Sequence, residues 1–230
     1  MKSEFLKMCY SKWMLLVTAL IPVFACGMLC LLPIHGVTGW ELYGTKCLQS
    51  FYLTQNWFIV LAALYFGEEY KSGALRSTLM ACPGRLRFLK EKTSCFFVWI
   101  TLVLCIAIAC SLIIILHYQD DIARTMWVHI GQVSLSILTL AGIAVALTII
   151  CRSGILSMAI GVALLMGAGH MLLQMSDIFM YLPGVCAMNA FYLNPMPGFL
   201  AIGEGLFCQG IWCVTLLCLA GYVFWRRSVR

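Results

Sequence analysis

Charged side chains are scarce in this sequence. Its 230 residues include only 15 Lys and Arg and nine Asp and Glu, so 10% are charged, whereas 63% are hydrophobic. Soluble domains carry about 25% charged residues. The mean hydropathy of +0.96 predicts that lipid surrounds most of the chain. This composition leaves no room for a separate soluble catalytic domain, and no nucleic-acid partner is expected.

Several chemical motifs are also missing. The sequence has no CxxC pair, no Cys/His cluster with zinc spacing and no GxxxxGK[ST] phosphate loop. Most of the 13 cysteines lie inside apolar runs, where they behave as small hydrophobic residues. Only Cys47 and Cys186 are expected on the outer side, either paired in a disulfide or free. We therefore expect no metal, no cofactor bound by this chain and no ATP hydrolysis of its own.

Six apolar runs are long enough, or nearly so, to cross a hydrocarbon core, which takes about 20 residues. They cover about 13–32, 48–66, 93–117, 128–151, 155–173 and 206–225. The second run contains Thr54, Gln55 and Asn56, so its outer boundary is the least sharply defined. The sequence predicts an all-α polytopic membrane protein, with residues 1–230 forming one transmembrane domain.

The distribution of Lys and Arg predicts the orientation of these runs. If both termini are cytoplasmic, 13 of the 15 basic residues lie inside and only Lys46 and Arg124 lie outside. Cytoplasmic loops of membrane proteins carry the excess of basic residues. We therefore expect both the N-terminus and the C-terminus on the cytoplasmic side.

Two further segments have their own patterns. Residues 1–12 mix lysines with apolar residues, which predicts an amphipathic helix on the inner surface, with a disordered basic tail as the alternative. Residues 174–205 are apolar but interrupted by three prolines and several glycines. We expect a pair of re-entrant or interfacial helices there, covered by protein, between the fifth and sixth spans.

The charge is concentrated in one segment, Gly67–Lys92, which holds nine of the 24 charged residues. A basic cytoplasmic loop can serve only to fix topology. That reading does not explain why Leu75 and Leu79 recur four residues apart, on one face of a helix that Ser72 would cap and Pro83 would help to end. We therefore expect a short amphipathic helix that binds a partner.

At these residues the chain resembles the permease subunits of ABC-2 type transporters. The similarity lies in Glu69 followed by Gly73-Ala74-Leu75-Arg76, then the turn Pro83-Gly84-Arg85, and then Lys92, with Ala74 where Thr is usual. The six-span plan and the long last outer loop are similar to the same family. In size and loop sequence the chain looks most like the short bacterial permeases of lantibiotic and other peptide-antibiotic immunity or export.

The resemblance implies a partner, a mechanism and a location in the cytoplasmic membrane of a bacterium. The loop would be a coupling helix seated in a separate ABC ATPase, which binds ATP and Mg; two ATPase copies would serve two permeases, identical or paralogous. The substrate would be apolar or amphipathic, with a peptide as the candidate. The implied coupling residues are Glu69, Gly73, Leu75, Arg76 and Leu79, with Arg85 and Lys92 anchoring the return to the membrane.

Polar residues inside apolar runs are costly and therefore informative. Five of them fall in the expected outer half of the spans: Gln55, Asn56, Gln132, His170 and Gln209. They could line the exit of a substrate path, or they could join helices by hydrogen bonds. Both readings stay open on the sequence alone.

The sequence leaves two other function classes open. Glu68-Glu69 followed by Arg76 loosely resembles intramembrane CAAX-type proteases, with His170 as the histidine. However, six residues rather than three separate the pair from the Arg, and His170 is expected near the opposite surface, beyond hydrogen-bond reach. A membrane scaffold or channel without ATP coupling is the other alternative, opposed only by the pattern of the charged loop.

Overall fold

The computed structural model describes residues 2–33, 39–70, 84–118 and 124–226. Throughout these residues the fold is helical, without a β-strand. The long helices are α2 (Lys12–Leu31), α3 (Trp40–Gly67), α5 (Arg85–Tyr118), α6 (Arg124–Cys151) and α9 (Ile202–Arg226). The shorter elements are α1 (Lys2–Tyr10), η1 (Glu68–Tyr70), α7 (Gly154–Ala163), η2 (Leu164–Ala168), α8 (Gly169–Leu173), η3 (Asp177–Tyr181) and η4 (Met188–Phe191).

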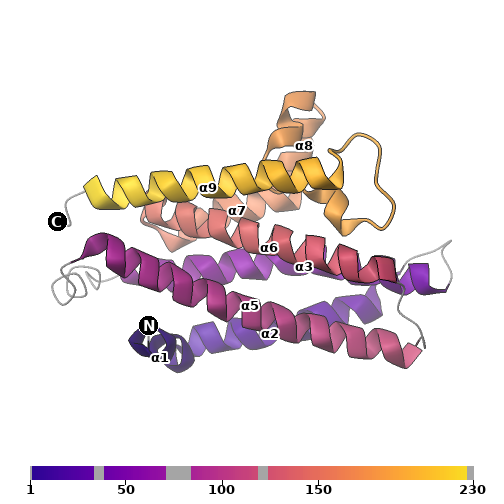
Figure 1. Ribbon diagram of the computed structural model, residues 1–230, viewed down its shortest axis with the longest axis horizontal. Coiled ribbons are helices and arrows are strands. Elements are labelled where there is room, and N and C mark those ends of the chain that lie inside the picture. Colours follow the sequence, from indigo (N-terminus) through magenta and orange to yellow (C-terminus); the bar gives the residue numbers. More distant parts are fainter. Residues whose placement is uncertain (1, 34–38, 71–83, 119–123, 227–230) are drawn as a thin grey trace.

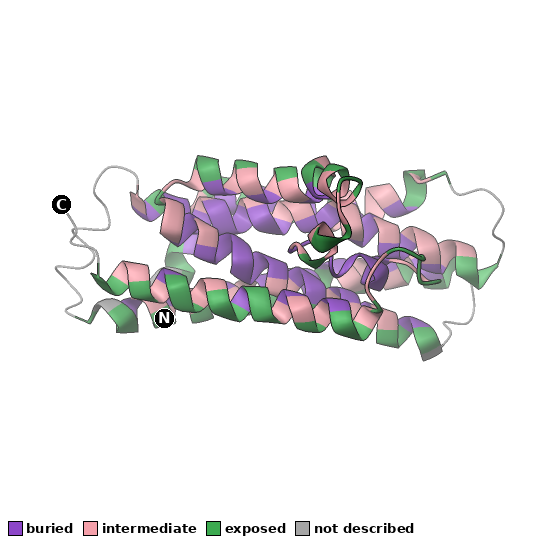
Figure 2. Ribbon diagram, turned by 90° about the horizontal axis from the view of Figure 1, so that it is seen from above, coloured by how far each residue is buried: buried purple, intermediate pink, exposed green. Residues whose placement is uncertain are grey.

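Among the described residues, five helical segments are long and apolar enough to cross a membrane: Lys12–Leu31, Leu86–Tyr118, Thr125–Cys151, Gly154–Leu173 and Ile202–Arg226. Exposed residues follow the outward faces of the long helices (Figure 2). They include large apolar side chains such as Ile113, Ile155 and Phe207, which are 66–73% exposed. Such surfaces need a lipid solvent. The chain therefore has the features of a multi-pass membrane protein.

Helix α3, which contains the second expected span, is not among these five segments. It is about 42 Å long at 1.5 Å per residue, but Thr54, Gln55 and Asn56 interrupt its apolar sequence. It is also the most enclosed long helix, packed against α2, α6 and α7, with Thr54 and Gln55 buried (Figures 1 and 2). Because protein rather than lipid surrounds it, α3 tolerates a polar composition.

Both described ends of the chain, the start of α5 and the turn between α6 and α7 lie at the same end of the bundle (Figure 1). The helix ends gathered there carry Lys7, Arg87, Lys90 and Arg152, so we call it the basic end. The opposite end includes the N-terminal turns of α3, with Lys46, and of α6. The charge asymmetry expected from the sequence thus separates the two ends of the fold.

The N-terminal segment is helical, as expected. In α1, Met8 is buried and the Phe5 ring lies 5.2 Å from the Trp99 ring of α5 in an edge-on contact. Leu6 and Tyr10 remain exposed. One face of α1 is thus fixed to the bundle while the other is free to contact a membrane surface.

Helix α5 is longer than the expected third span. Helix α5 starts at Arg85, eight residues before the predicted start at 93, and Gly84 O accepts a 2.9 Å hydrogen bond from Phe88 N. At about 51 Å α5 exceeds the roughly 30 Å hydrocarbon core. Its basic first two turns therefore extend beyond the apolar part, and Lys92 lies inside the helix rather than at its start.

The fifth expected span is a broken helix. Between α7 and α8 the π-turn η2 (Leu164–Ala168) leaves the regular hydrogen-bond pattern, and the Tyr52 hydroxyl of α3 donates a 3.1 Å bond to Leu165 O. At Gly169 a Cβ would lie 2.6 Å from Leu164 O and 2.7 Å from Val185 Cγ2. The turn therefore depends on a donor from another helix and on a residue without a side chain.

The segment between α8 and α9, where a pair of re-entrant or interfacial helices was expected, forms two short 3₁₀ helices, η3 and η4. Residues 183–191, which we call the buried plug, are enclosed by protein. The Asn189 amide closes the following loop: its Nδ2 donates to Leu200 O at 2.9 Å, and its Oδ1 accepts from Met196 N at 2.9 Å. Cys186, in the plug, and Cys47, in α3, are both free thiols.

We predict that single cysteines will distinguish the plug from the segment before it. In a cysteine-depleted background, Ile178→Cys should react rapidly with a membrane-impermeant thiol reagent, because Ile178 is 77% exposed. Ala190→Cys should react at least tenfold more slowly, because Ala190 is fully buried. Equal rates in intact membranes would show that the plug is not enclosed.

Candidate functional site at the basic end

The coupling residues expected from the sequence fall into two groups. Gly73, Leu75, Arg76 and Leu79 lie outside the described residues, as does the proposed cap Ser72. Arg85 is the first residue of α5. Glu69 and Lys92, which flank the loop, are fully described and lie together although they are 23 residues apart.

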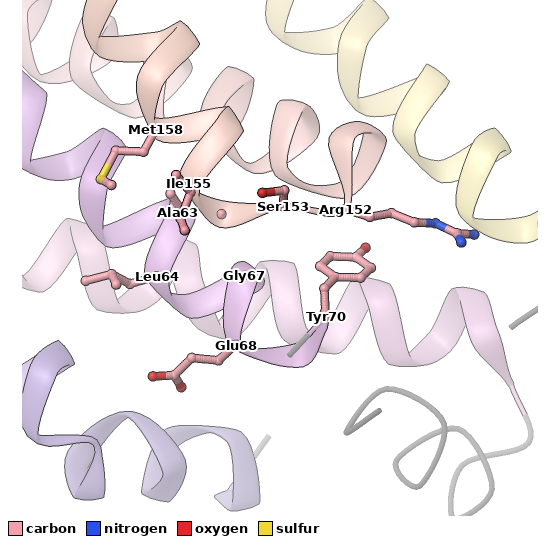
Figure 3. Close-up of a pocket in the computed structure, with 10 residues that line it drawn as sticks. Ala63, Leu64, Gly67, Glu68, Tyr70, Arg152, Ser153, Ile155 and Met158 are labelled. Carbon is pink, nitrogen blue, oxygen red and sulfur yellow. The ribbon is translucent and has the colours of Figure 1, made fainter. Parts of the chain in front are cut away.

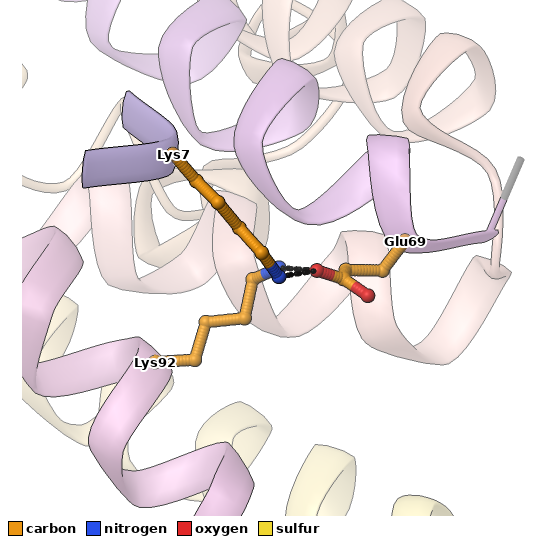
Figure 4. A network of polar contacts seen from close by, with 3 residues as sticks. All are labelled: Lys7, Glu69 and Lys92. Carbon is orange, nitrogen blue, oxygen red and sulfur yellow. Dashed lines mark hydrogen bonds and ion pairs between the residues drawn. The ribbon is translucent and has the colours of Figure 1, made fainter. Parts of the chain in front are cut away.

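An ion network joins three elements at the basic end (Figure 4). The Lys92 ammonium of α5 donates a 2.7 Å hydrogen bond to Oε1 of Glu69 in η1. Lys7 Nζ of α1 lies 3.5 Å from the same oxygen. The Lys92 and Glu69 side chains are only 3% and 10% exposed, whereas the Lys7 side chain is 52% exposed. The network therefore consists of a buried pair and a half-exposed third member.

Aromatic rings surround the buried ammonium. Lys92 Nζ lies 4.5 Å from the centroid of the Tyr65 ring, 5.5 Å from that of Phe66 and 5.9 Å from that of Phe88. The faces of aromatic rings attract cations, most strongly where water is excluded. Rings from the last turn of α3 and the first turn of α5 thus stabilise the Lys92 ammonium in addition to its pairing with Glu69.

The Glu69 carboxyl is kept ionised by its partners. Burial alone raises its pKa, but the Lys92 ammonium and, to a lesser extent, Lys7 lower it, and the net direction of the pKa is downward. Glu69 is 8% exposed, so its carboxylate faces inward. Within this chain it positions the entry of the loop relative to α1 and α5 and is not an exposed contact.

A cavity of about 260 Å³ lies beside the network, between the end of α3 and the start of α7 (Figure 3). The two backbones meet there, since a Cβ on Gly67 would lie 2.9 Å from the Cα of Gly154. Ser153 caps α7 by accepting a 3.3 Å hydrogen bond from Leu156 N. Arg152 has a φ of 53°, which costs a side-chain-bearing residue roughly 1–2 kcal/mol.

The five polar residues expected on a substrate path have different environments. Gln209 is fully buried and bonded to Ser136 of α6: its Oε1 accepts from Oγ at 3.0 Å, and its Nε2 donates to the backbone oxygen at 3.2 Å. These two hydrogen bonds join α9 to α6, which is the second of the two alternatives left open by the sequence. The His170 ring lies 6.4 Å from the Phe199 ring.

The other three have a buried side-chain atom with no hydrogen-bond partner among the described residues: Gln55 Nε2, Asn56 Oδ1 and Gln132 Oε1. Buried polar atoms are normally paired, with protein or with water. These three residues therefore remain the candidates for the lining of a polar path.

Several residues of the basic end were not expected from the sequence. Lys7 was expected only as a basic residue of the amphipathic N-terminal helix on the cytoplasmic side, and Tyr65 only as part of an apolar run. The acidic pair Glu68-Glu69 just after one span and a Lys near the start of the next were the available signal, because adjacent antiparallel helices bring such residues together. Nothing in the sequence of α1 or α7 indicated that these two helices would approach the same place.

A scan against models of protein families finds no match, and a search of curated proteins finds no significantly similar sequence. The functional assignment therefore depends on the residues of this chain and their geometry.

Proposed function

We propose that this chain is the transmembrane permease subunit of an ATP-binding cassette exporter in the cytoplasmic membrane of a bacterium. It would have six spans, with α3 as the enclosed second span, and both termini inside. Residues 174–201 would re-enter the membrane from the outside, with the plug covered by protein. The substrate is an apolar or amphipathic molecule, with a peptide as the candidate, moved to the outer leaflet or released.

The network of Lys7, Glu69 and Lys92 is the observation that carries this proposal. It joins the amphipathic α1, the end of α3 and the start of α5 at one point, and residues 71–83 connect two of these three elements. A protein that pushes on this loop would move three elements together. An ATPase that drives a permease needs such a joint, because its own movement must reach the membrane spans. Two ATPase copies would serve two permeases, with ATP and Mg held on the ATPase.

A scaffold or channel would not need this coupling, so binding of an ATPase decides between the classes. Tagged protein purified from its native membranes should recover an ATPase with a GxxxxGK[ST] sequence, identified by mass spectrometry. Leu75→Asp should lower that recovery at least tenfold, because a carboxylate would have to be desolvated in the contact and about 1.4 kcal/mol corresponds to a factor of ten.

Lys46→Asp, at the opposite end of the bundle, is the matched control for a new carboxylate. It should leave the recovery of the ATPase and ATP hydrolysis in the membranes unchanged. If Leu75→Asp retains both at the level of this control, the charged loop only fixes topology and the transporter proposal fails.

A further inference from the structure

The cavity at the basic end is amphipathic. One side is apolar and is formed by Leu64 of α3 and by Ile155 and Met158 of α7 (Figure 3). Ile155 is 72% exposed on the membrane-facing surface of a helix that is long and apolar enough to span, once α8 is included. This side of the cavity therefore opens toward the region where acyl chains lie.

The other side is polar and basic. Tyr70, Ser153 and Arg152 lie there, and Figure 3 shows the Arg152 side chain extending past Tyr70, away from the apolar side. Within the described part of the chain, Arg152 has no ion-pair partner. The nearby Glu68 carboxylate points away from Arg152, and its Oε1 accepts a 3.4 Å hydrogen bond from Ser11 Oγ. The positive charge of Arg152 thus lies at the rim of the cavity, and the Glu68 carboxylate is not turned toward it.

From this geometry we propose that the cavity binds an anionic phospholipid of the membrane leaflet at the basic end. The phosphate lies against Arg152 and Ser153, and the first part of one acyl chain lies along Leu64, Ile155 and Met158. A volume of about 260 Å³ suits a headgroup and the start of a chain, with the remainder of the lipid in the bilayer. Basic pockets between helices at the cytoplasmic surface bind headgroups in this manner.

The proposal depends on the chain being in a membrane but not on an ATPase. Its location suggests a consequence for the exporter: the lipid would touch both η1, which carries the network residue Glu69, and the start of α7. Loss of the lipid would then loosen the junction between the end of α3 and α7, next to the proposed coupling loop.

Native mass spectrometry of the purified chain in a neutral detergent tests the site. The probes are phosphatidylglycerol and phosphatidylcholine with identical acyl chains. The wild-type protein should retain phosphatidylglycerol in preference. Arg152→Asn should weaken that binding about fivefold, the factor that corresponds to about 1 kcal/mol for one basic residue near a membrane surface. Asn adopts positive φ more readily than most residues, so the turn should persist.

Arg87→Asn is the matched control, because Arg87 lies at the same end but is exposed and paired with Glu91 at 3.1 Å. It should leave the preference unchanged. Ile155→Asn should weaken phosphatidylglycerol binding as well, since it removes part of the apolar side. No preference between the two lipids, or equal losses in Arg152→Asn and Arg87→Asn, would overturn the proposal.

Inorganic phosphate and glycerol phosphate distinguish a lipid from a soluble ligand. Neither should displace phosphatidylglycerol at millimolar concentration, because they lack the acyl chain. Displacement by either one, with no effect of Ile155→Asn, would show a site for a soluble phosphate and would refute the lipid assignment. Failure to recover an ATPase would leave this result untouched, so the two proposals fail separately.

Discussion

Replacing Lys92 with Met is expected to destabilise the protein by roughly 2–4 kcal/mol, since removing one partner of a buried ion pair leaves an uncompensated charge. Met nearly conserves the volume of the side chain, so packing against Tyr65 and Phe66 is retained. Lys7 remains 3.5 Å from Glu69, but its half-exposed ammonium offsets only part of the loss. The measurement is thermal unfolding in detergent, followed with a dye that reacts with newly exposed cysteines.

Lys90→Met, an exposed position on the same helix, is the control and should change stability by less than about 0.5 kcal/mol. Combining Lys92→Met with Glu69→Gln should recover part of the loss, because no unpaired charge is then buried. If Lys92→Met unfolds like the control, Glu69 and Lys92 do not form the joint between α3 and α5 on which the coupling proposal depends.

The pH dependence of stability should show the same network. The folded protein lowers the pKa of Glu69 below its ordinary value, which is about 4.3. The network therefore stabilises the fold fully above that ordinary value, and the contribution disappears as pH falls through the lowered pKa. The difference in unfolding temperature between the wild type and the double variant should be largest near pH 7 and should decrease below about pH 4.

Gly205→Ala is expected to destabilise the protein by roughly 1–3 kcal/mol or more, the range for over-packed cores. A Cβ at Gly205 of α9 would overlap the carbonyl oxygen of Cys186 and approach its carbonyl carbon to 3.0 Å. These are backbone atoms of the buried plug and cannot rotate aside. The whole plug would have to move away from α9, which should also make the fully buried Cys186 thiol reactive.

Two neighbouring glycines of α9 provide controls. A Cβ on Gly203 or Gly210 would meet nothing within 4 Å. Ala at either position should be neutral or should stabilise the helix by up to about 1 kcal/mol through its higher helix propensity. If Gly205→Ala behaves like these controls and Cys186 stays unreactive, the plug does not rest on α9 as described.

The sequence by itself determined that the chain is helical and carries apolar helices of membrane-spanning length. Hydrophobic length and charge are local properties, so α2, α6 and α9 could be placed to within about four residues. The same holds for the gathering of basic residues at one end of the bundle. Helix boundaries beyond the apolar run, such as Trp40 for α3 and Arg85 for α5, were missed because apolar and charged residues alternate there and no continuous apolar run marks the helix.

Only the tertiary structure decided which residues meet. Glu69 lies 23 residues before Lys92 and 62 residues after Lys7, and Tyr52 reaches a carbonyl 113 residues away. A sequence shows that a polar group in an apolar helix needs a partner, but it does not show which one, because partners are chosen by how helices pack. For the same reason α3, the least apolar of the long helices, became the most enclosed one: its neighbours α2, α6 and α7 surround it with protein in place of lipid.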